Sequence, residues 1–222
     1  PLEVDAKNPY VVTSPLNAVI EEVKVFPNEK VEKEQLIVTF DNVDFINNYN
    51  VAKRTLDVAN AELFTAQQSS FLDPKQKSQI AQLESQVKLK EAELNFAQEQ
   101  LGKTKIYAKE EGIAIINNPN DWKGKPVNTG ERIFLIANPN SIEVKIMLPV
   151  SDAIFLEENA IVKAFFDNDP TNSWKAKVKY ISYKPELTEQ NVLSYRIIAD
   201  FDDIKENGYI PSIGLRGTAK IY

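Results

Sequence analysis

The sequence predicts a mainly β protein into which two long helices are inserted. Three observations support this fold class. Residues 10–42 and 103–149 contain short runs of β-branched residues separated by turn residues, a pattern typical of strands. Residues 43–102, between them, keep a helical periodicity throughout. Residues 150–222 return to strict alternation of polar and apolar side chains, which indicates strands with one exposed face.

Composition excludes several functional classes. The chain contains no Cys and no His, so it lacks thiol chemistry and the commonest general base and metal ligand. Its formal net charge is -6 and its lysines are not clustered in the sequence, whereas a nucleic-acid-binding protein needs a basic face. Its seven Gly residues form no phosphate-binding motif. We therefore expect no enzyme, no cofactor, no metal site and no nucleic-acid partner.

Residues 10–42 are predicted to form one half of a β module. Strands are expected at Val11–Thr13, Ala18–Ile20, Val23–Phe26 and Gln35–Phe40. Turn residues such as Ser14-Pro15 and Pro27-Asn28 separate them. Residues 1–9 are expected to be a linking strand that joins a barrel or a further domain.

Residues 43–102 are predicted to form an antiparallel coiled-coil hairpin. Apolar residues recur at alternating spacings of three and four along two seams: Phe45, Tyr49, Ala52, Leu56, Ala59, Leu63 and Ala66, then Ile80, Leu83, Val87, Lys90, Leu94, Ala97 and Leu101. Asp73 is expected to cap the second helix with Pro74 at its first position, and Gly102 to end it. Because the seams are narrow, a free-standing hairpin is favoured over two helices packed on a globular core, which remains the alternative.

The predicted tip of this hairpin is a candidate partner-binding site, formed by Ser69, Ser70, Phe71, Leu72 and Asp73. A Phe-Leu pair at an exposed turn offers a small apolar surface to another protein. The alternative is that Phe71 and Leu72 close the end of the coiled coil as a hydrophobic staple.

Residues 103–149 repeat the first half of the β module. Ser14–Ile20 matches Ala108–Ala114, and Val31–Ile37 matches Val127–Ile133. The second copy is two residues longer in the loop around Trp122. The hairpin is therefore predicted to interrupt a single β module.

This order of elements resembles the HlyD-type membrane fusion proteins, which are periplasmic adaptor subunits of bacterial efflux and secretion systems. The resemblance rests on SPLNAVIEEVKV and NEKVEKEQLI, on EEGIAII and GKPVNTGERIFLI, and on IEVKIMLPVSDAIFL and IPSIGLRGTAKIY. Ala18, Glu29 and Glu34 stand where the family usually has Gly. The resemblance implies a split lipoyl-like β-sandwich over 10–42 and 103–149, followed by a β-barrel domain over 150–222.

The resemblance also implies a structural function. Such adaptors link an inner-membrane transporter of the ABC, proton-driven or major-facilitator type to an outer-membrane channel, and they self-associate into a ring in the complex. The implied location is the periplasm, with an anchor to the inner membrane outside these 222 residues. Many efflux adaptors carry an Arg, Leu and Ser set near the hairpin tip, which is absent here because Arg54 is the only Arg before Arg132.

Two other functions stay open at the level of sequence. A lipoyl- or biotinyl-type carrier needs a lysine in the turn between the two halves, but the hairpin takes this place and no Lys lies between Lys33 and Lys53. A carboxylate-dependent hydrolase needs two acidic side chains with perturbed pKa values in one cleft.

Two further groups of residues in the last region are predicted to be structural. The aromatic residues Phe165, Phe166, Trp174 and Tyr180 are expected to form barrel core more than a ligand-binding surface. The acidic residues are expected to be turn residues and not cation ligands, because they lack the spacing of a calcium loop: Asp167, Asp169, Asp200, Asp202 and Asp203.

Overall fold

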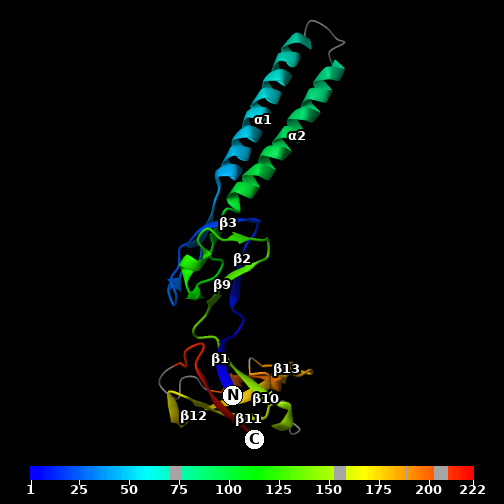
Figure 1. Cartoon of the computed structure of the whole chain (residues 1–222). Helices are drawn as coiled ribbons and strands as arrows, with labels where there is room; N and C mark the ends of the chain where they lie inside the picture. Colours follow the sequence, from blue (N-terminus) through cyan, green and yellow to red (C-terminus); the bar gives the residue numbers. More distant parts are fainter. Residues whose placement is uncertain (71–76, 153–158, 189, 203–209) are drawn as a thin grey trace. The chain divides into compact units, whose positions relative to one another are not determined.

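The structure is a computed structural model that describes residues 1–70, 77–152, 159–188, 190–202 and 210–222 (Figure 1). The prediction of a mainly β chain with two helices is confirmed. The chain divides into two compact units. The first unit contains Pro1–Tyr10, Glu111–Ile115 and Leu135–Tyr222, and the second contains Val11–Glu110 and Ile116–Phe134.

The first unit contains a closed β-barrel, to which the described residues contribute six strands. The strands follow the order β10, β1, β15, β11, β12 and β14, and β14 pairs back onto β10 to close the sheet. Their bounds are Leu2–Ala6 (β1), Ile142–Pro149 (β10), Ile161–Phe166 (β11), Asp169–Ile181 (β12), Leu193–Phe201 (β14) and Arg216–Ile221 (β15). A short strand, β13 (Glu186–Leu187), pairs with β14 outside the closed ring.

Two of these strands come from outside the predicted barrel range of 150–222. Strand β1 pairs with β10 and β15, so residues 1–9 supply a barrel strand, as one of the two predicted alternatives has it. Strand β10 lies in the range 103–149, which the sequence assigns to the β module. Its buried residues Ile142, Val144 and Ile146 belong to the barrel core, so this boundary is corrected. An alternating strand looks the same in the sequence whichever of two cores it faces.

The second unit contains most of the β module, which consists of two four-stranded sheets. One has the order β2-β9-β7-β4 and the other β6-β5-β3-β8. The first half of the module supplies β2 (Tyr10–Thr13), β3 (Ala18–Val23), β4 (Lys30–Val31) and β5 (Leu36–Phe40), and the second supplies β6 (Lys105–Tyr107), β7 (Gly112–Ile115), β8 (Pro126–Val127) and β9 (Arg132–Ala137). Exchanging the two halves strand by strand converts the order of one sheet into that of the other, as expected for an internal repeat.

Backbone hydrogen bonds follow the register that the repeat predicts. The amide of Gly130 donates to the carbonyl of Ser14 at 2.8 Å. At the matching places of the other copy, the amide of Glu34 donates to the carbonyl of Ala108 at 2.7 Å. Gly130 and Glu34 both have a positive φ, 85° and 66°. Glu34 therefore holds a conformation that favours glycine, as its place in the repeat implies.

The second predicted Gly-like place shifts by one residue. Asn28, with a φ of 62°, matches Gly124, with a φ of 76°, whereas Glu29 has no positive φ. Asn tolerates the left-handed backbone better than most residues because its short polar side chain can bond locally. The turn thus keeps its shape without glycine.

Helices α1 (Val43–Ser70) and α2 (Lys77–Gly102) lie side by side, are in contact and run in opposite directions (Figure 1). We call this pair the helical hairpin. Every predicted seam residue of both helices is buried or half-buried. The buried ones are Ala59, Ala66, Val87 and Ala97. Small seam residues allow close approach of the two helices.

The predicted ends of α2 differ in outcome. Asp73 and Pro74 lie outside the described residues. Gly102 is the last helical residue, and its φ lies outside the left-handed region that a C′ glycine adopts. The chain leaves the helix instead through further backbone bonds, in which the Lys103 amide donates to Glu99 and the Thr104 amide donates to Leu101.

Two buried threonines at the base of the hairpin predict opposite mutational effects. The Thr104 hydroxyl donates to the carbonyl of Leu101 at 2.7 Å, but the buried Thr39 hydroxyl has no hydrogen-bond partner among the described residues. A buried hydroxyl without a partner costs desolvation free energy. Thr39→Val should therefore raise the free energy of unfolding by about 1 kcal/mol, whereas Thr104→Val should lower it by a similar amount. Urea unfolding of both variants checks this, and the reverse order of stabilities would contradict it.

Candidate functional site

The acidic residues of the described part of the chain are dispersed and engaged in local contacts. They form no cluster of three or more Asp and Glu side chains placed to hold a metal ion. Of the predicted turn acids, Asp200 is 3.0 Å from Lys7 Nζ and Asp202 is 2.9 Å from Lys177 Nζ. Asp169 accepts hydrogen bonds from the Asn172 and Thr171 side chains, which lower its pKa. Asp203 lies outside the described residues.

The barrel aromatics divide between core and surface. Trp174 and Phe166 are buried, Phe165 is half-buried and Tyr180 is exposed. The Trp174 ring lies edge-on to Phe166, with centroids 6.0 Å apart. The core prediction therefore holds for Trp174 and Phe166, and Tyr180 belongs to the surface.

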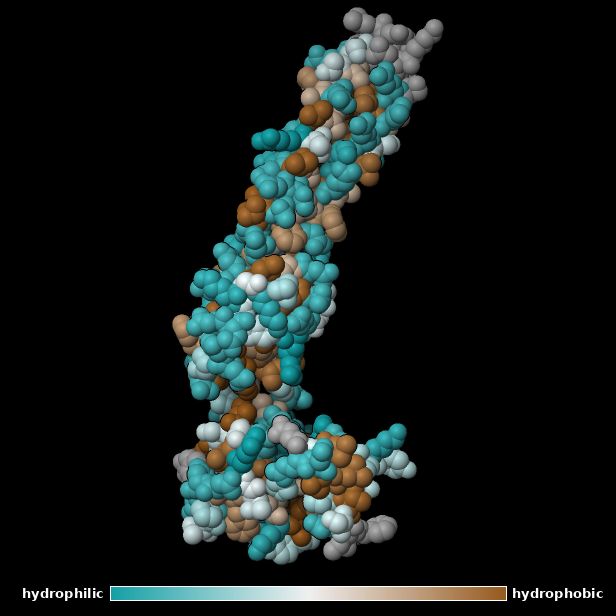
Figure 2. All heavy atoms as spheres, viewed as in Figure 1, coloured by the Kyte–Doolittle hydropathy of each residue, from teal (hydrophilic) through white to brown (hydrophobic). Residues whose placement is uncertain are grey.

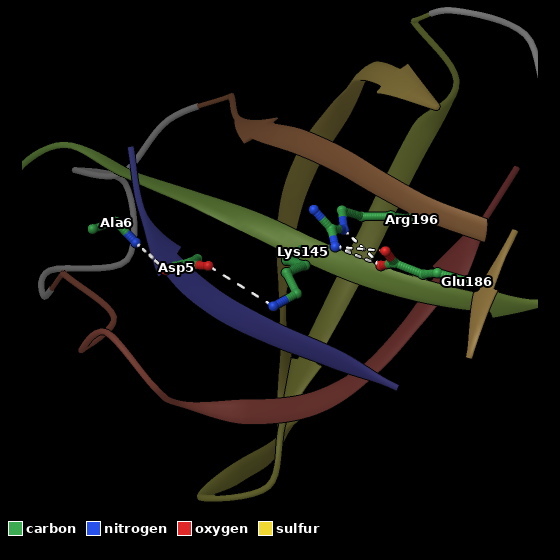
Figure 3. Close-up of polar contacts among 5 residues, drawn as sticks. All are labelled: Asp5, Ala6, Lys145, Glu186 and Arg196. Atoms are coloured by element: carbon green, nitrogen blue, oxygen red, sulfur yellow. Dashed lines mark hydrogen bonds and ion pairs between the residues drawn. The ribbon is translucent and has the colours of Figure 1, made fainter. Parts of the chain in front are cut away.

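Ion pairs on the barrel strands are shown in Figure 3. Arg196 on β14 makes a bidentate pair with Glu186 on β13, with both N–O distances 2.7 Å. Asp5 on β1 accepts a hydrogen bond from the Ala6 amide at 2.8 Å and lies 4.0 Å from Lys145 Nζ on β10. The two ion pairs join neighbouring strands, so these charged side chains have a structural role.

Glu143 is the one described carboxyl group whose pKa is clearly raised. Desolvation by burial is the main cause of this raised pKa, and the nearby carboxylates of Asp200 and Asp5 raise it further. The ammonium groups of Lys179 and Lys7 lower the pKa and offset part of this rise. Asp5 lies directly opposite Glu143 in the strand register. A hydrolase would need a second such group in the same cleft, and the described residues provide none.

The raised pKa predicts a pH-dependent effect of Glu143→Gln. The ionised form is disfavoured in the folded state, so the wild-type chain gains stability as pH falls through the folded-state pKa. The Gln variant should therefore be slightly more stable than wild type at neutral pH, by less than about 1 kcal/mol because water screens the partly exposed group. This advantage should disappear below about pH 4, where the wild-type carboxyl is protonated. Thermal unfolding over that pH range checks the sign.

The place that a carrier domain would use for modification is occupied. Strands β5 and β6 pair antiparallel, with Val38 opposite Ile106 and Thr39 opposite Lys105, and the helical hairpin connects them. Lys33 lies in the turn before β5, and Lys53 lies within α1. Neither is at the connection between β5 and β6, so the structure gives the carrier alternative no support.

The predicted tip residues are described only in part. Ser69 is in the last turn of α1, and its hydroxyl donates to the carbonyls of Thr65 and Ala66. Ser70 is the last residue of the helix. Phe71, Leu72 and Asp73 lie outside the described residues, so their role in docking stays a prediction.

A shallow groove runs between the two helices along one face of the hairpin. Val58 and Glu62 line both of its two adjoining parts. Arg54 and Lys90 line the part nearer the β module, whereas Ala66 and Gln79 line the part nearer the end of α1. No other long helix covers this groove in the described residues.

Several large apolar side chains on the hairpin are exposed. Four of them come in pairs seven residues apart, and we call these four the outer stripe. They are Val51, Val58, Leu89 and Phe96, which are 61%, 58%, 57% and 64% exposed. Figure 2 shows hydrophobic side chains among the hydrophilic surface of the hairpin. Within each helix the two residues are seven apart, so they lie on one face. The sequence contains this spacing, but the stronger seam pattern hides it.

The outer stripe lies at matching levels on the two helices. Val58 lines the groove together with Gln86 and Lys90, so Leu89 is at its level. One heptad toward the base of the hairpin, Val51 and Phe96 are at the same level because the helices run in opposite directions.

Comparison with known proteins identifies the fold. No protein-family model matches the chain, and no curated protein sequence matches it. Solved structures do match it over nearly its whole length. The membrane fusion protein Spr0693 from Streptococcus pneumoniae R6 matches with 20% identity and a TM-score of 0.72, covering 100% of this chain and 98% of that one. The chain has the fold of a membrane fusion protein.

Two further solved structures have the same fold over nearly the whole of this chain. MacA from Actinobacillus actinomycetemcomitans matches with 17% identity and a TM-score of 0.73, covering 99% of this chain and 78% of that one. The periplasmic adaptor protein EmrA matches with 12% identity and a TM-score of 0.56, covering 99% and 96%. Because the three sequence identities are 20% or lower, these matches show the fold that the chain shares with them. Among the described residues of this chain, no helix is both long and apolar enough to cross a membrane.

Proposed function

We propose that this chain is a periplasmic adaptor that links an inner-membrane transporter to an outer-membrane exit channel. The observation that carries the proposal is the helical hairpin inserted between β5 and β6, in a chain with the membrane fusion protein fold.

The helical hairpin provides the length that bridging two partners requires. We propose that it works as a two-stranded coiled coil, because both seams are narrow and the remaining faces are exposed. The 28 residues of α1 extend about 40 Å at roughly 1.5 Å per residue. Both helix ends are tied into the β module, since the amide of Phe40 donates to the carbonyl of Thr104 at 2.9 Å. A stiff arm on a β base can bridge two partners.

We propose that the far end of the hairpin docks on the exit channel and that the barrel engages the transporter. The docking residues are those that the sequence singles out: Ser69, Ser70, Phe71, Leu72 and Asp73. The Ser69 hydroxyl is engaged within its own helix, so the apolar pair Phe71 and Leu72 would provide most of the contact.

We further propose that the copies in the complex form a ring through the outer stripe. Side-by-side hairpins place α1 of one copy next to α2 of its neighbour, with Val58 facing Leu89 and Val51 facing Phe96. Burial of these exposed apolar groups favours such association. Asp57 and Lys88 are adjacent to Val58 and Leu89 in sequence, are exposed, and would meet across the same interface with opposite charges.

The ring contact is tested by disulfide trapping, because the chain contains no Cys. Differently tagged copies that carry either Val58→Cys or Leu89→Cys should form a mixed disulfide when they are coexpressed and oxidised in cells. The control pairs Val51→Cys copies with Leu89→Cys copies, whose levels differ by one heptad or about 10 Å. Equal yields from the two pairs, or no mixed disulfide from either, would contradict the proposed interface.

The adaptor role itself is tested by co-purification. The full-length protein, crosslinked in cells and extracted from membranes with mild detergent, should be isolated with an integral-membrane transporter. Recovery of the protein without any membrane partner would contradict the proposal, whereas recovery with a transporter but without a channel would restrict it to the inner membrane.

A further inference from the structure

The barrel brings together three lysines that are far apart in the sequence. Lys163 on β11 lies directly opposite Lys220 on β15 and directly opposite Lys175 on β12. The three side chains therefore form one row across three adjacent strands, which we call the lysine row. Sequence inspection finds no lysine cluster because the row exists only in the strand register.

The lysine row faces outward. The residues that alternate with it are core residues: Val162 and Ala164 on β11, and Trp174 and Ala176 on β12. Neighbouring strands are about 4.8 Å apart, so three ammonium-bearing side chains lie close together on the outer face. Like charges directly opposite each other in a sheet repel.

No carboxylate neutralises this row among the described residues. Neither Lys163, Lys175 nor Lys220 has an acidic partner within 4.0 Å in that part of the chain. Asp200 at the end of the adjacent strand β14 is paired with Lys7, and Asp202 just after this strand is paired with Lys177. The row is thus a local positive surface on a chain whose net charge is -6.

Aromatic and apolar side chains border the lysine row. Lys163 Nζ lies 5.1 Å from the centre of the Tyr222 ring, and Lys220 Nζ lies 5.7 Å from the centre of the Phe165 ring. Tyr222 is 68% exposed, and Ile161, next to this row on β11, is 50% exposed. Lysines with aromatic rings beside them are typical of surfaces that lie at a membrane–water interface.

We propose that this face of the barrel binds the surface of an anionic membrane, with the lysine row on lipid phosphates and the bordering side chains at the headgroup level. The chain as a whole is repelled from a negative surface, so only a local positive face can bind it, and binding fixes the orientation of the barrel. The match of charge and of bordering aromatic residues favours lipid over an acidic protein surface. The proposal does not depend on the adaptor role, because it needs no transporter or channel.

The test is sedimentation of the full chain with vesicles of phosphatidylcholine containing about 30 mol% phosphatidylserine, against vesicles of phosphatidylcholine alone. Wild type should bind the anionic vesicles and lose binding as salt is added. The triple variant Lys163→Gln, Lys175→Gln, Lys220→Gln should bind about 100-fold more weakly, because each lysine near an anionic surface contributes about fivefold. Its melting temperature should be no lower than that of wild type, because repulsion within the row is removed.

The matched control carries the same charge change on the β module, at the exposed lysines Lys30, Lys33 and Lys109. It should lose less than about threefold in binding. Equal losses in both triple variants would overturn the proposal, since they would report net charge alone. Failure of wild type to bind either vesicle would also overturn it and would point to an acidic protein partner. Inorganic phosphate at millimolar concentration is added as a competitor, with sodium chloride at the same ionic strength as the control. If phosphate releases the chain from the vesicles and sodium chloride does not, the site binds free phosphate and the membrane assignment is rejected.

Discussion

Trp174→Ala is expected to lower the free energy of unfolding of the barrel by about 4 kcal/mol. Trp174 is 1% exposed and is the largest fully buried side chain of the chain's described residues. Its ring contacts Phe166 and Phe201, with centroids 6.0 and 5.9 Å away. The closed sheet surrounds it on all sides, so its neighbours cannot collapse far into the space that the substitution leaves.

The measurement is denaturant unfolding followed by circular dichroism and by fluorescence. The second Trp of the chain, Trp122, is half-buried in the other unit and has the Lys125 ammonium 4.1 Å above its ring. In the Trp174→Ala variant, Trp122 fluorescence and the helical signal should keep their wild-type midpoints while the barrel unfolds earlier. Trp122→Ala, the control, should cost less than about 1.5 kcal/mol. A Trp174→Ala barrel of wild-type stability would contradict the core assignment.

Excision of the hairpin is expected to abolish transport while the β module still folds. Strands β5 and β6 are antiparallel neighbours, and Phe40 is hydrogen-bonded to Thr104 at their ends. A two-residue Asn-Gly turn can therefore join Asp41 to Thr104 in place of residues 42–103. The shortened chain should lose most of its signal at 222 nm and unfold cooperatively, within about 2 kcal/mol of the parent β module.

The functional readout is rescue of a strain that lacks the gene. The excised protein should give no rescue at all. The matched control removes one heptad from each helix at equal levels, residues 57–63 and 84–90, which keeps both seams continuous and shortens the hairpin by about 10 Å. It should give less rescue than wild type, because the shortened hairpin spans less of the distance between the two partners. Full rescue by the excised protein would show that the hairpin has no part in the function.

The features that the sequence predicts well are those with a short repeat. The hairpin seams follow a heptad, so every seam position from Phe45 to Leu101 could be predicted before the structure. The internal repeat predicts that Glu34 takes the conformation of Gly130, and it does. The family resemblance puts the other Gly-like position at Glu29, whereas the register of the repeat puts it at Asn28, opposite Gly124, where the positive φ is found.

The features that the sequence does not predict depend on pairing between distant residues. The place of β10 in the barrel follows from its pairing with β1 and β14, which the alternating pattern does not specify. The lysine row requires the registers of β11 with both β12 and β15. The outer stripe could have been found from its spacing of seven, but its meaning depends on knowing that both helices present it at the same level.

The central claim is that this chain bridges two membrane partners, and site-specific photo-crosslinking in cells tests it most directly. One photoreactive residue replaces Gln68, which is exposed near the end of α1, and another replaces Leu187, which is 67% exposed on β13, outside the closed ring of the barrel. The bridging role predicts that Gln68 captures an outer-membrane channel and that Leu187 captures an inner-membrane transporter. Capture of the same partner from both positions, or of no membrane protein from either, would contradict it.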